Sequence, residues 1–320
     1  MCVRPAASRD RPVTAAGTRV GAMRLGLLSP FTATTVGDPA YLRRLAVAVE
    51  EAGAESFWTV EHILVAEDYE PRYPYSADGR MPGGGAALMP DPLQVLAFVG
   101  AHTSRIRLGT SVVVATQHPA VILAKTVATL DVLSGGRVVL GVGMGWQVEE
   151  YRAVNVPYEG RGRRLDETID AVRACWAPNP ASYTGATVSF DRVRVDPKPA
   201  QPGGVPIVIG GSSAAAARRA GRRGDGWFPY VVGPADVAEG IATIRDAGAA
   251  AGRDPGAIEI TVWPGSWDYA RGTDPVLLRE LAALGVDRIV VTAAEAGATD
   301  VDTVASFVAR IRGVLDDVSG

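Results

Sequence analysis

An acidic and a basic side chain stand next to each other at Glu61-His62, directly after the apolar run Ser56–Val60. An ordinary imidazole, with a pKa near ~6.5, can donate a proton to a bound ring or substrate, or accept one from it. A position directly after a strand-like run predicts His62 as a catalytic acid or base, with Glu61 beside it. The structural alternative is a histidine that caps the strand end or pairs with Glu61.

Two glycine-rich turns offer places where a ligand can approach the backbone. Gly141-Val142-Gly143-Met144-Gly145-Trp146 ends a Val-rich run, and its glycines would admit a flat ring or a phosphate because no Cβ intervenes. Gly210-Gly211-Ser212-Ser213 joins an apolar run to an Ala-rich helix, so its backbone N–H groups and hydroxyls predict a phosphate seat. A tight turn and an ordinary N-cap at Ser212 or Ser213 are the structural alternatives.

The remaining histidines and the two cysteines give weaker signals. His102 falls in a helix-to-strand connection, where a structural role is expected. His118 precedes a proline at a helix start, where it could contact a ligand or cap the helix. Cys2 lies near the N-terminus and Cys175 on an apolar helix face, so we expect no disulfide, no metal site and a reducing cytoplasm.

Eight short runs rich in Val, Ile and Leu would position these candidates, with helical patterns between them. The runs are Arg24–Leu28, Ser56–Val60, Ile106–Val113, Val138–Val142, Pro206–Ile209, Gly226–Phe228, Ile258–Val262 and Arg288–Thr292. Strands that alternate with helices pair in parallel, because a parallel connection needs a crossover. Eight such units close rather than leave an open sheet with edges. The sequence therefore predicts an α/β fold, a (β/α)8 TIM barrel, with insertion loops at the C-terminal mouth.

The expected helices are well delimited. Asp38-Pro39, Asp91-Pro92 and Asp274-Pro275 can each cap and start a helix. Two long segments, residues 64–90 and residues 177–205, interrupt the pattern, and loops of such length are usually lids or binding loops. The first of them follows a strand, so we expect it over the mouth of the barrel. Its tyrosines indicate an apolar organic substrate.

Composition and charge argue against several functions. The formal net charge of −3 is spread along the 320 residues, so no basic face indicates a nucleic-acid or membrane partner. No apolar run approaches the ~18 residues that a membrane span needs. Residues 1–22 lack apolar periodicity and the apolar stretch of a signal peptide, which predicts a disordered tail. A single domain is expected over residues 23–320, with Met23 as an alternative start of translation.

Together these segments resemble the luciferase-like flavin-dependent family, and in particular its coenzyme F420-dependent branch. The resemblance covers residues 23–228 and weakens toward the C-terminus. Its most specific segments are Arg107–Val113, His118–Ala120, Leu123–Lys125, Leu130–Arg137 and Gly141–Trp146. Further matches are Arg161, Arg164, Glu167, Pro197–Pro199 and Pro206–Ser212.

The resemblance implies roles that spacing cannot show. It implies that the strand carrying Ser111-Val112 bulges, often through a non-proline cis peptide, and supports the back of a tricyclic ring. It places Glu61-His62 beside the ring edge, with His62 and Glu61 as the catalytic pair. The implied cofactor contacts are Glu61, Ser111, Val112, Gly143, Met144, Gly145, Trp146, Gly210, Gly211, Ser212 and Ser213.

One residue departs from the pattern. Some F420-dependent sugar dehydrogenases have a carboxylate where this chain has Trp146, so their proton donor has no counterpart here. Glu149 and Glu150 are close in sequence, but the resemblance assigns that role to neither.

Three functions remain open from the sequence. The leading hypothesis is hydride transfer between a small organic substrate and F420, with His62 as acid or base. A reduced-FMN monooxygenase fed by a separate reductase shares the same barrel, and a flavin or F420 reductase is a candidate partner. A cofactor-free barrel lyase, or a binding protein without catalysis, is the third. We expect a homodimer with no metal.

Overall fold

Eight parallel strands close on themselves in the computed structural model, which describes residues 22–30, 37–81, 88–266 and 273–319. Neighbours follow the order β3-β2-β1-β11-β10-β9-β8-β5, and β5 pairs back onto β3 with Val138 opposite Leu108. The strands are β1 (Arg24–Leu28), β2 (Ser56–Thr59), β3 (Arg107–Thr110), β5 (Val138–Gly143), β8 (Ile207–Gly210), β9 (Gly226–Phe228), β10 (Glu259–Val262) and β11 (Arg288–Thr292). The predicted (β/α)8 barrel is confirmed. The tail predicted over residues 1–22 lies outside the described residues, apart from Ala22.

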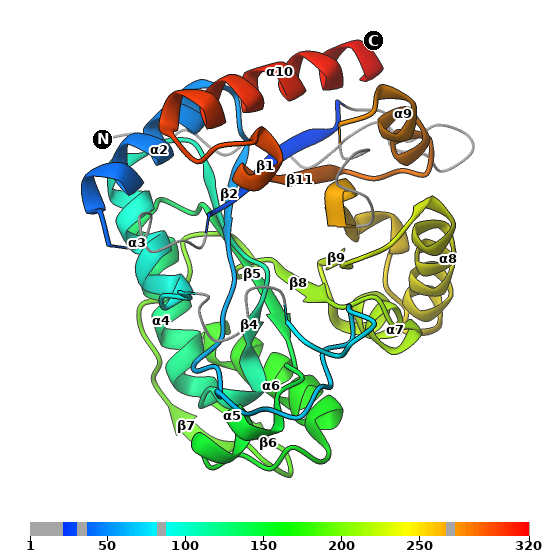
Figure 1. Cartoon of the computed structure of the whole chain (residues 1–320). Coiled ribbons are helices and arrows are strands. Elements are labelled where there is room, and N and C mark those ends of the chain that lie inside the picture. Colours follow the sequence, from blue (N-terminus) through cyan, green and yellow to red (C-terminus); the bar gives the residue numbers. More distant parts are fainter. Residues whose placement is uncertain (1–21, 31–36, 82–87, 267–272, 320) are drawn as a thin grey trace.

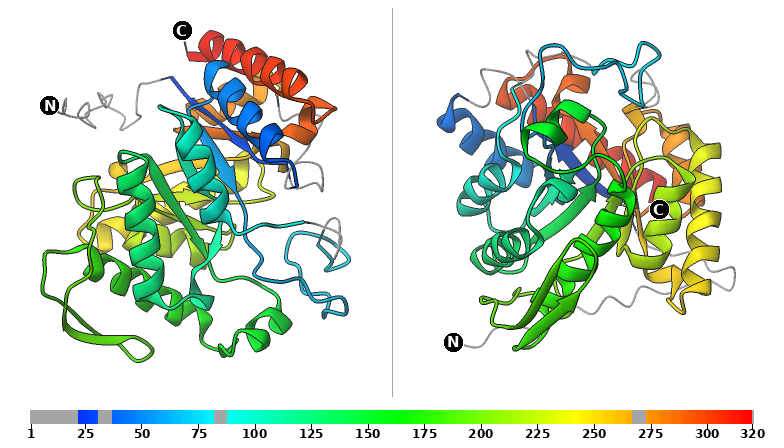
Figure 2. Two further views of the ribbon diagram at one scale, coloured as in Figure 1. Left: turned by 90° about the vertical axis from the view of Figure 1, so that its left-hand side faces the viewer. Right: turned by 90° about the horizontal axis from the view of Figure 1, so that it is seen from below.

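Helices surround the barrel on its outer side (Figures 1 and 2). They are α2 (Pro39–Glu51), α3 (Pro92–His102), α4 (Ala120–Leu133), α6 (Arg161–Trp176), α7 (Ala214–Arg223), α8 (Pro234–Ala250), α9 (Pro275–Ala283) and α10 (Val301–Ser319), with a short α5 (Val148–Ala153) after β5. The three predicted Asp-Pro openings are confirmed, because Asp38, Asp91 and Asp274 each accept a backbone N–H of the first turn at 2.8–2.9 Å. Among the helices of the described chain, none is long and apolar enough to cross a membrane.

The run predicted as one strand from Ile106 to Val113 is broken. β3 ends at Thr110, and a two-residue strand β4 (Val113–Val114) resumes pairing with β5. Between them lies a cis peptide bond at Ser111-Val112, in agreement with the bulge that the family resemblance implies. Ser111 N–H still donates to Thr59 O at 2.6 Å, so the bulge remains tied to β2.

The segment 177–205, predicted to be a long loop, contains an antiparallel hairpin. β6 (Ala181–Thr184) pairs with β7 (Ser189–Val193), and the rings of Tyr183 and Phe190 lie 6.2 Å apart. The turn is tied to α6, because the Thr187 backbone and hydroxyl both donate to Glu167 at 2.7 Å. The loop prediction was wrong because both strands are short and partly exposed, so no apolar alternation reveals them.

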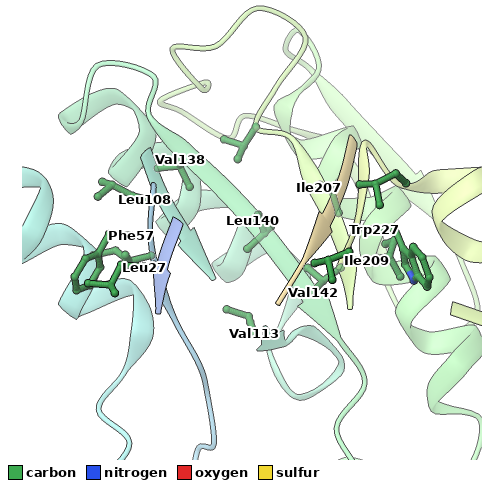
Figure 3. Packing of buried hydrophobic residues seen from close by; sticks show 14 of the residues in the cluster. Leu27, Phe57, Leu108, Val113, Val138, Leu140, Val142, Ile207, Ile209 and Trp227 are labelled. Atoms are coloured by element: carbon green, nitrogen blue, oxygen red, sulfur yellow. The ribbon is translucent and has the colours of Figure 1, made fainter. Parts of the chain in front are cut away.

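Apolar side chains fill the space between strands and helices. Leu27, Phe57 and Leu108 are paired in register on the neighbouring strands β1, β2 and β3, and all three are fully buried. Figure 3 shows them with matching residues from β5, β8 and β9. These side chains belong to the alternate positions of the strands that face the helices, which explains the Val, Ile and Leu content of the predicted runs.

A separate cluster occupies the inside of the barrel, centred on Trp58. Its members come from strands all around the ring: Leu28, Trp58, Val139, Val208, Phe228, Trp263 and Val290. A Cβ at Gly26 or Gly109, on the two strands that flank β2, would lie 2.6 Å and 2.4 Å from the indole. The glycines on both sides therefore make room for one large ring, and Phe228 meets its edge at 5.4 Å.

Ion pairs close the amino-terminal end of the barrel beneath Trp58. Arg288 is fully buried and contacts Glu55 at 2.8 Å and Glu259 at 3.4 Å, while Arg24 contacts Glu259 at 3.0 Å. Burial alone would raise the pKa of Glu55 and of Glu259, but the charges of Arg288, Arg24 and Arg107 together lower each to about 2. Both carboxyls are therefore ionised in the folded protein at neutral pH, and this end of the barrel is charged but paired.

Gly109→Ala is expected to lower the free energy of unfolding by about 1–3 kcal/mol, because the new methyl group overpacks against the Trp58 ring. Urea or thermal unfolding followed by circular dichroism measures the change. Gly313→Ala is the matched control: this glycine lies inside α10 with nothing within 4 Å of the added Cβ. There we expect a gain of about 0.5–1 kcal/mol. Equal effects of the two substitutions would contradict the packing argument.

Candidate active site

A cavity of about 350 Å³ opens at the carboxyl ends of the barrel strands. Its floor is the upper part of the Trp58 cluster, since Leu28, Phe228 and Trp263 belong to both. The predicted site residues that line it are Glu61, His62, Ser111, Val112, Gly145, Trp146, Gly210 and Gly211. Residues from four separate parts of the sequence therefore meet in one place, as expected for the active site of a (β/α)8 enzyme.

Four other predicted contact residues lie outside this lining: Gly143, Met144, Ser212 and Ser213. Ser213 is the N-cap of α7 and accepts Ala216 N–H at 3.2 Å. The Ser212 hydroxyl is hydrogen-bonded to the backbone of Tyr230, from which it accepts an N–H at 2.9 Å. The Met144 carbonyl accepts the Tyr151 hydroxyl. These four side chains or turns support the residues that do face the cavity.

The glycines at the strand ends have a reason that the sequence did not reveal. A Cβ at Gly143 or at Gly210 would lie 2.5 Å from a methyl group of Val112, and one at Gly141 would lie 1.8 Å from Thr110 O. The space that these glycines leave is therefore filled by the bulge between β3 and β4. Gly211, by contrast, is required for its conformation: its φ of +111° favours glycine, and an added Cβ would meet nothing nearer than 3.3 Å. Its N–H donates to Phe228 O and its carbonyl accepts the Trp227 indole.

Glu61 does not pair with its sequence neighbour, so the interpretation of His62 as a partner of Glu61 is wrong. The Glu61 carboxylate accepts Val114 N–H at 2.6 Å and lies 3.0 Å from Nε2 of His118. Burial would lower the pKa of His118, but the hydrogen bond and the charge of Glu61 outweigh burial and raise it. Glu61 and His118 together hold the segment after the Ser111-Val112 bulge, which gives His118 a structural contact at the edge of the site.

His62 turns instead toward Glu150, a residue that sequence reasoning left without a role. Nδ1 of the imidazole lies 3.3 Å from Glu150 Oε2, and the ring meets Trp146 edge-on at 5.8 Å. The Glu150 side chain has no exposed surface and that of His62 has 10%. No local pattern could reveal this pair, since 88 residues separate its members. The only available signal was the presence of an acidic residue on the first turn after β5.

The same short helix anchors the loop that follows β2. Glu150 Oε1 accepts Ile63 N–H at 2.6 Å, Gln147 Oε1 accepts Ala66 N–H at 3.3 Å, and Glu149 Oε1 accepts Glu70 N–H at 3.3 Å. In Figure 1 this loop, in light blue, runs beside α5. Backbone groups that would otherwise be unpaired in a long loop are thereby satisfied.

Aromatic rings extend from His62 across the cavity. The aromatic arc consists of Tyr69, Tyr73, Tyr75, Trp146, Tyr230 and Trp263, with neighbouring ring centroids 4.9–5.4 Å apart. Tyr73, Tyr75 and Met81 place the loop after β2 in the lining of the cavity, as predicted for the segment 64–90, of which residues 82–87 lie outside the described residues. The Tyr75 hydroxyl is hydrogen-bonded to Ser212, and burial raises its pKa.

The structural role predicted for His102 agrees with its position. His102 ends α3, where its Nδ1 lies 2.8 Å from Phe98 O, far from the cavity lining. Within the described part of the chain, no group of three or more His, Cys, Asp or Glu side chains is arranged to hold a metal ion. The lining supplies the imidazole of His62, the carboxylate of Glu61, serine and tyrosine hydroxyls and backbone groups, and Glu150 contacts His62 from outside the lining.

The profile of the luciferase-like monooxygenase family matches residues 19–305 of this barrel and its site. The chain therefore belongs to the luciferase-like family, whose members are oxidoreductases. An uncharacterized protein of Mycobacterium tuberculosis is 34% identical over 298 residues, which cover 92% of this chain and 99% of that protein. An F420-dependent glucose-6-phosphate dehydrogenase of Nakamurella multipartita is 37% identical over 194 residues, which cover 59% of this chain and 52% of the relative.

Solved structures have the same fold. The F420-dependent tetrahydromethanopterin reductase of Methanopyrus kandleri superposes with a TM-score of 0.68 at 17% identity, covering 90% of this chain and 97% of that one. Monooxygenase RslO1 of Streptomyces bottropensis gives a TM-score of 0.67 at 22% identity, covering 89% and 96%. At such identities the likeness extends to the fold alone. With the family membership and the F420-dependent relative, the site belongs to an enzyme that uses a deazaflavin or a flavin.

The pairing of Glu61 with His118 leads to a pH-dependent prediction. In ¹⁵N-histidine-labelled protein, NMR titration is expected to give His118 a pKa above the ordinary ~6.5. Glu61→Gln removes the charge that raises this pKa and leaves the burial that lowers it, so the pKa of His118 should fall. Because the folded value is raised, the stabilisation from this pair is complete below pH ~6.5 and is lost as pH rises through the folded pKa.

Glu67→Gln, at an exposed position of the loop after β2, is the control for this titration and should leave the pKa of His118 unchanged. An unperturbed His118 in the unaltered protein, or the same value in Glu61→Gln, would show that the two side chains are not paired in solution.

Proposed function

We propose that the protein is an F420-dependent oxidoreductase that transfers a hydride between the deazaflavin and a small organic substrate. The observation that carries the proposal is the meeting of three features at one cavity: the Ser111-Val112 bulge, His62, and the start of α7 at Gly211. The F420-dependent relative at 37% identity supports the choice of coenzyme. The aromatic arc favours an apolar substrate.

The residues of the cavity fit a planar ring system that carries a phosphate. Ser111 and Val112 of the bulge line the cavity, and Gly145 and Trp146 belong to the same lining. Gly211 lines the cavity just before α7, whose N-terminal N–H groups would attract an anion such as a phosphate. When bound, the deazaflavin supplies hydride transfer.

In this proposal the protein's own groups bind, orient and move protons. His62 accepts the proton that leaves the substrate in the oxidising direction and returns it in the reducing direction. Glu61 acts on the site through the bulge, because its carboxylate holds Val114 N–H and His118 rather than His62. The aromatic arc with Met81 limits water beside the reacting atoms.

A reduced-FMN monooxygenase is the second candidate. The family profile bears the monooxygenase name, and RslO1 has the same fold. In that case a separate flavin reductase would be the partner, whereas in the leading proposal an F420 reductase could regenerate the coenzyme. The family membership counts against a cofactor-free lyase or a non-catalytic binding protein. We further propose a cytoplasmic homodimer.

Equilibrium titration of the protein with F420 and FMN in parallel tests the choice of coenzyme. We expect F420 to bind in the micromolar range or tighter, and FMN at least ~10-fold more weakly, a difference of ~1.4 kcal/mol. A deazaflavin without its phosphate should also bind more weakly than F420 if the start of α7 holds the anion. Equal or reversed affinities for F420 and FMN would move the assignment to the monooxygenase.

His62→Ala tests the acid/base role. Coenzyme affinity should stay within a few-fold of the unaltered protein, while turnover falls by about 10²–10⁴, the usual contribution of a positioned acid or base. The assay follows oxidation of reduced coenzyme by a panel of enones and quinones, and added imidazole should restore part of the lost rate. His102→Ala, at the exposed end of α3, is the control and should keep full turnover. Unaltered turnover in His62→Ala would remove His62 from the mechanism.

A further inference from the structure

Within the described residues, Glu150 is a buried acidic side chain that forms no ion pair with a lysine or arginine. Its carboxylate has no exposed surface. Oε1 accepts Ile63 N–H at 2.6 Å, with Leu64 N–H at 3.5 Å, and Oε2 faces Nδ1 of His62 at 3.3 Å. A buried carboxylate needs hydrogen-bond donors on its oxygens, because water is not there to supply them. The backbone satisfies Oε1, so the imidazole is the donor left for Oε2.

This requirement determines which nitrogen of His62 carries the proton. An ionised carboxylate only accepts hydrogen bonds, so Nδ1 must be the protonated nitrogen of the neutral ring. Nε2 is then the acceptor. No hydrogen bond joins Nε2 to another side chain or backbone group of the described residues, and His62 lines the cavity. The basic nitrogen is therefore the one available to a bound substrate.

We propose that Glu150 is the positioning residue of His62: it fixes the Nδ1–H tautomer and stabilises the imidazolium that forms when Nε2 takes a proton. The proposal rests on the proposed function for the identity of the reaction. In the oxidising direction, a substrate heteroatom gives its proton to Nε2, and a C–H bond gives its hydrogen and electron pair to the deazaflavin. The substrate is oxidised, the coenzyme is reduced, and the positive charge on the ring is balanced by Glu150 across 3.3 Å.

Glu61 and Trp146, which also lie next to His62, cannot position its imidazole in this way. Glu61, its sequence neighbour, is engaged with His118 and Val114 N–H. Trp146 meets the imidazole edge-on and offers no acceptor. Glu150 lies in the first turn of α5, so one carboxylate joins the acid/base residue after β2 to the segment that carries Trp146. The position of His62 thus depends on a residue that does not line the cavity.

The unaltered protein gives the first test, because it contains only three histidines. In ¹⁵N-histidine-labelled protein at a pH where all three rings are neutral, a long-range ¹H–¹⁵N correlation distinguishes the protonated nitrogen from the bare one. We expect His62 to have the proton on Nδ1. A His62 ring with the proton on Nε2 would overturn the proposal without any substitution.

Glu150→Gln provides the second test. The amide has one acceptor oxygen, which the short contact to Ile63 N–H retains, so its NH2 group faces Nδ1 of His62. Nδ1 then becomes the acceptor, and the proton is expected to move to Nε2. Turnover should fall by about 10²–10⁴, as in His62→Ala, because the basic nitrogen no longer faces the cavity. Coenzyme affinity and KM should stay within a few-fold.

Glu149→Gln is the matched control. Glu149 lies on the same helix and anchors the same loop, through Glu70 N–H, but does not contact His62. A purely structural role of α5 predicts similar effects of the two substitutions, whereas positioning predicts a changed tautomer and lost turnover in Glu150→Gln alone. An unchanged tautomer in a folded Glu150→Gln protein would overturn the proposal. Failure of F420 to bind would refute the proposed function and leave the tautomer result intact.

Discussion

The packing of Trp58 inside the barrel is the constraint on which the site depends. One indole lies inside the ring of strands, and the neighbouring strands β1 and β3 carry glycine where the indole packs against them. The ion pairs around Arg288 close the barrel below this ring. Side chains thus fill the described barrel from its amino-terminal end up to Trp58, and the cavity lies at the carboxyl ends of the strands. The cavity begins directly above the side chains of the Trp58 cluster.

Two crossed acid–histidine pairs then give this mouth its shape. Glu61 and His62 are consecutive in an extended segment, so their side chains point in opposite directions. Glu61 reaches His118 and the bulge after β3, while His62 reaches Glu150 after β5. Each pair joins β2 to a different neighbouring connection. Glu61 thus fixes the bulge that would support a cofactor ring, and its neighbour His62 is held in place as the group that would transfer a proton.

The sequence alone predicted the barrel, because the pattern that identifies each strand or helix involves residues close together in the chain. Apolar runs bounded by glycine, and Asp-Pro pairs such as Asp38-Pro39, depend on neighbours within a few residues. The break at Ser111-Val112 was accessible only through resemblance to a family, since the segment Ile106–Val113 has a continuous strand-like composition with no proline in it. The hairpin of β6 and β7 has no apolar alternation, and the contact of His62 with Glu150 joins positions 88 residues apart. Such long-range pairs exist only once the strands are side by side.

The same aromatic residues that shape the cavity give the protein an optical property. Of its six tryptophans, Trp146 and Trp263 line the cavity, and Trp58 lies directly beneath them in the cluster that forms its floor. Flavins and deazaflavins absorb light at the wavelengths where indoles emit. Energy transfer over such short separations makes the intrinsic fluorescence of the chain a built-in reporter of occupancy, and the depth of quenching reflects how close the bound chromophore comes to the centre of the barrel.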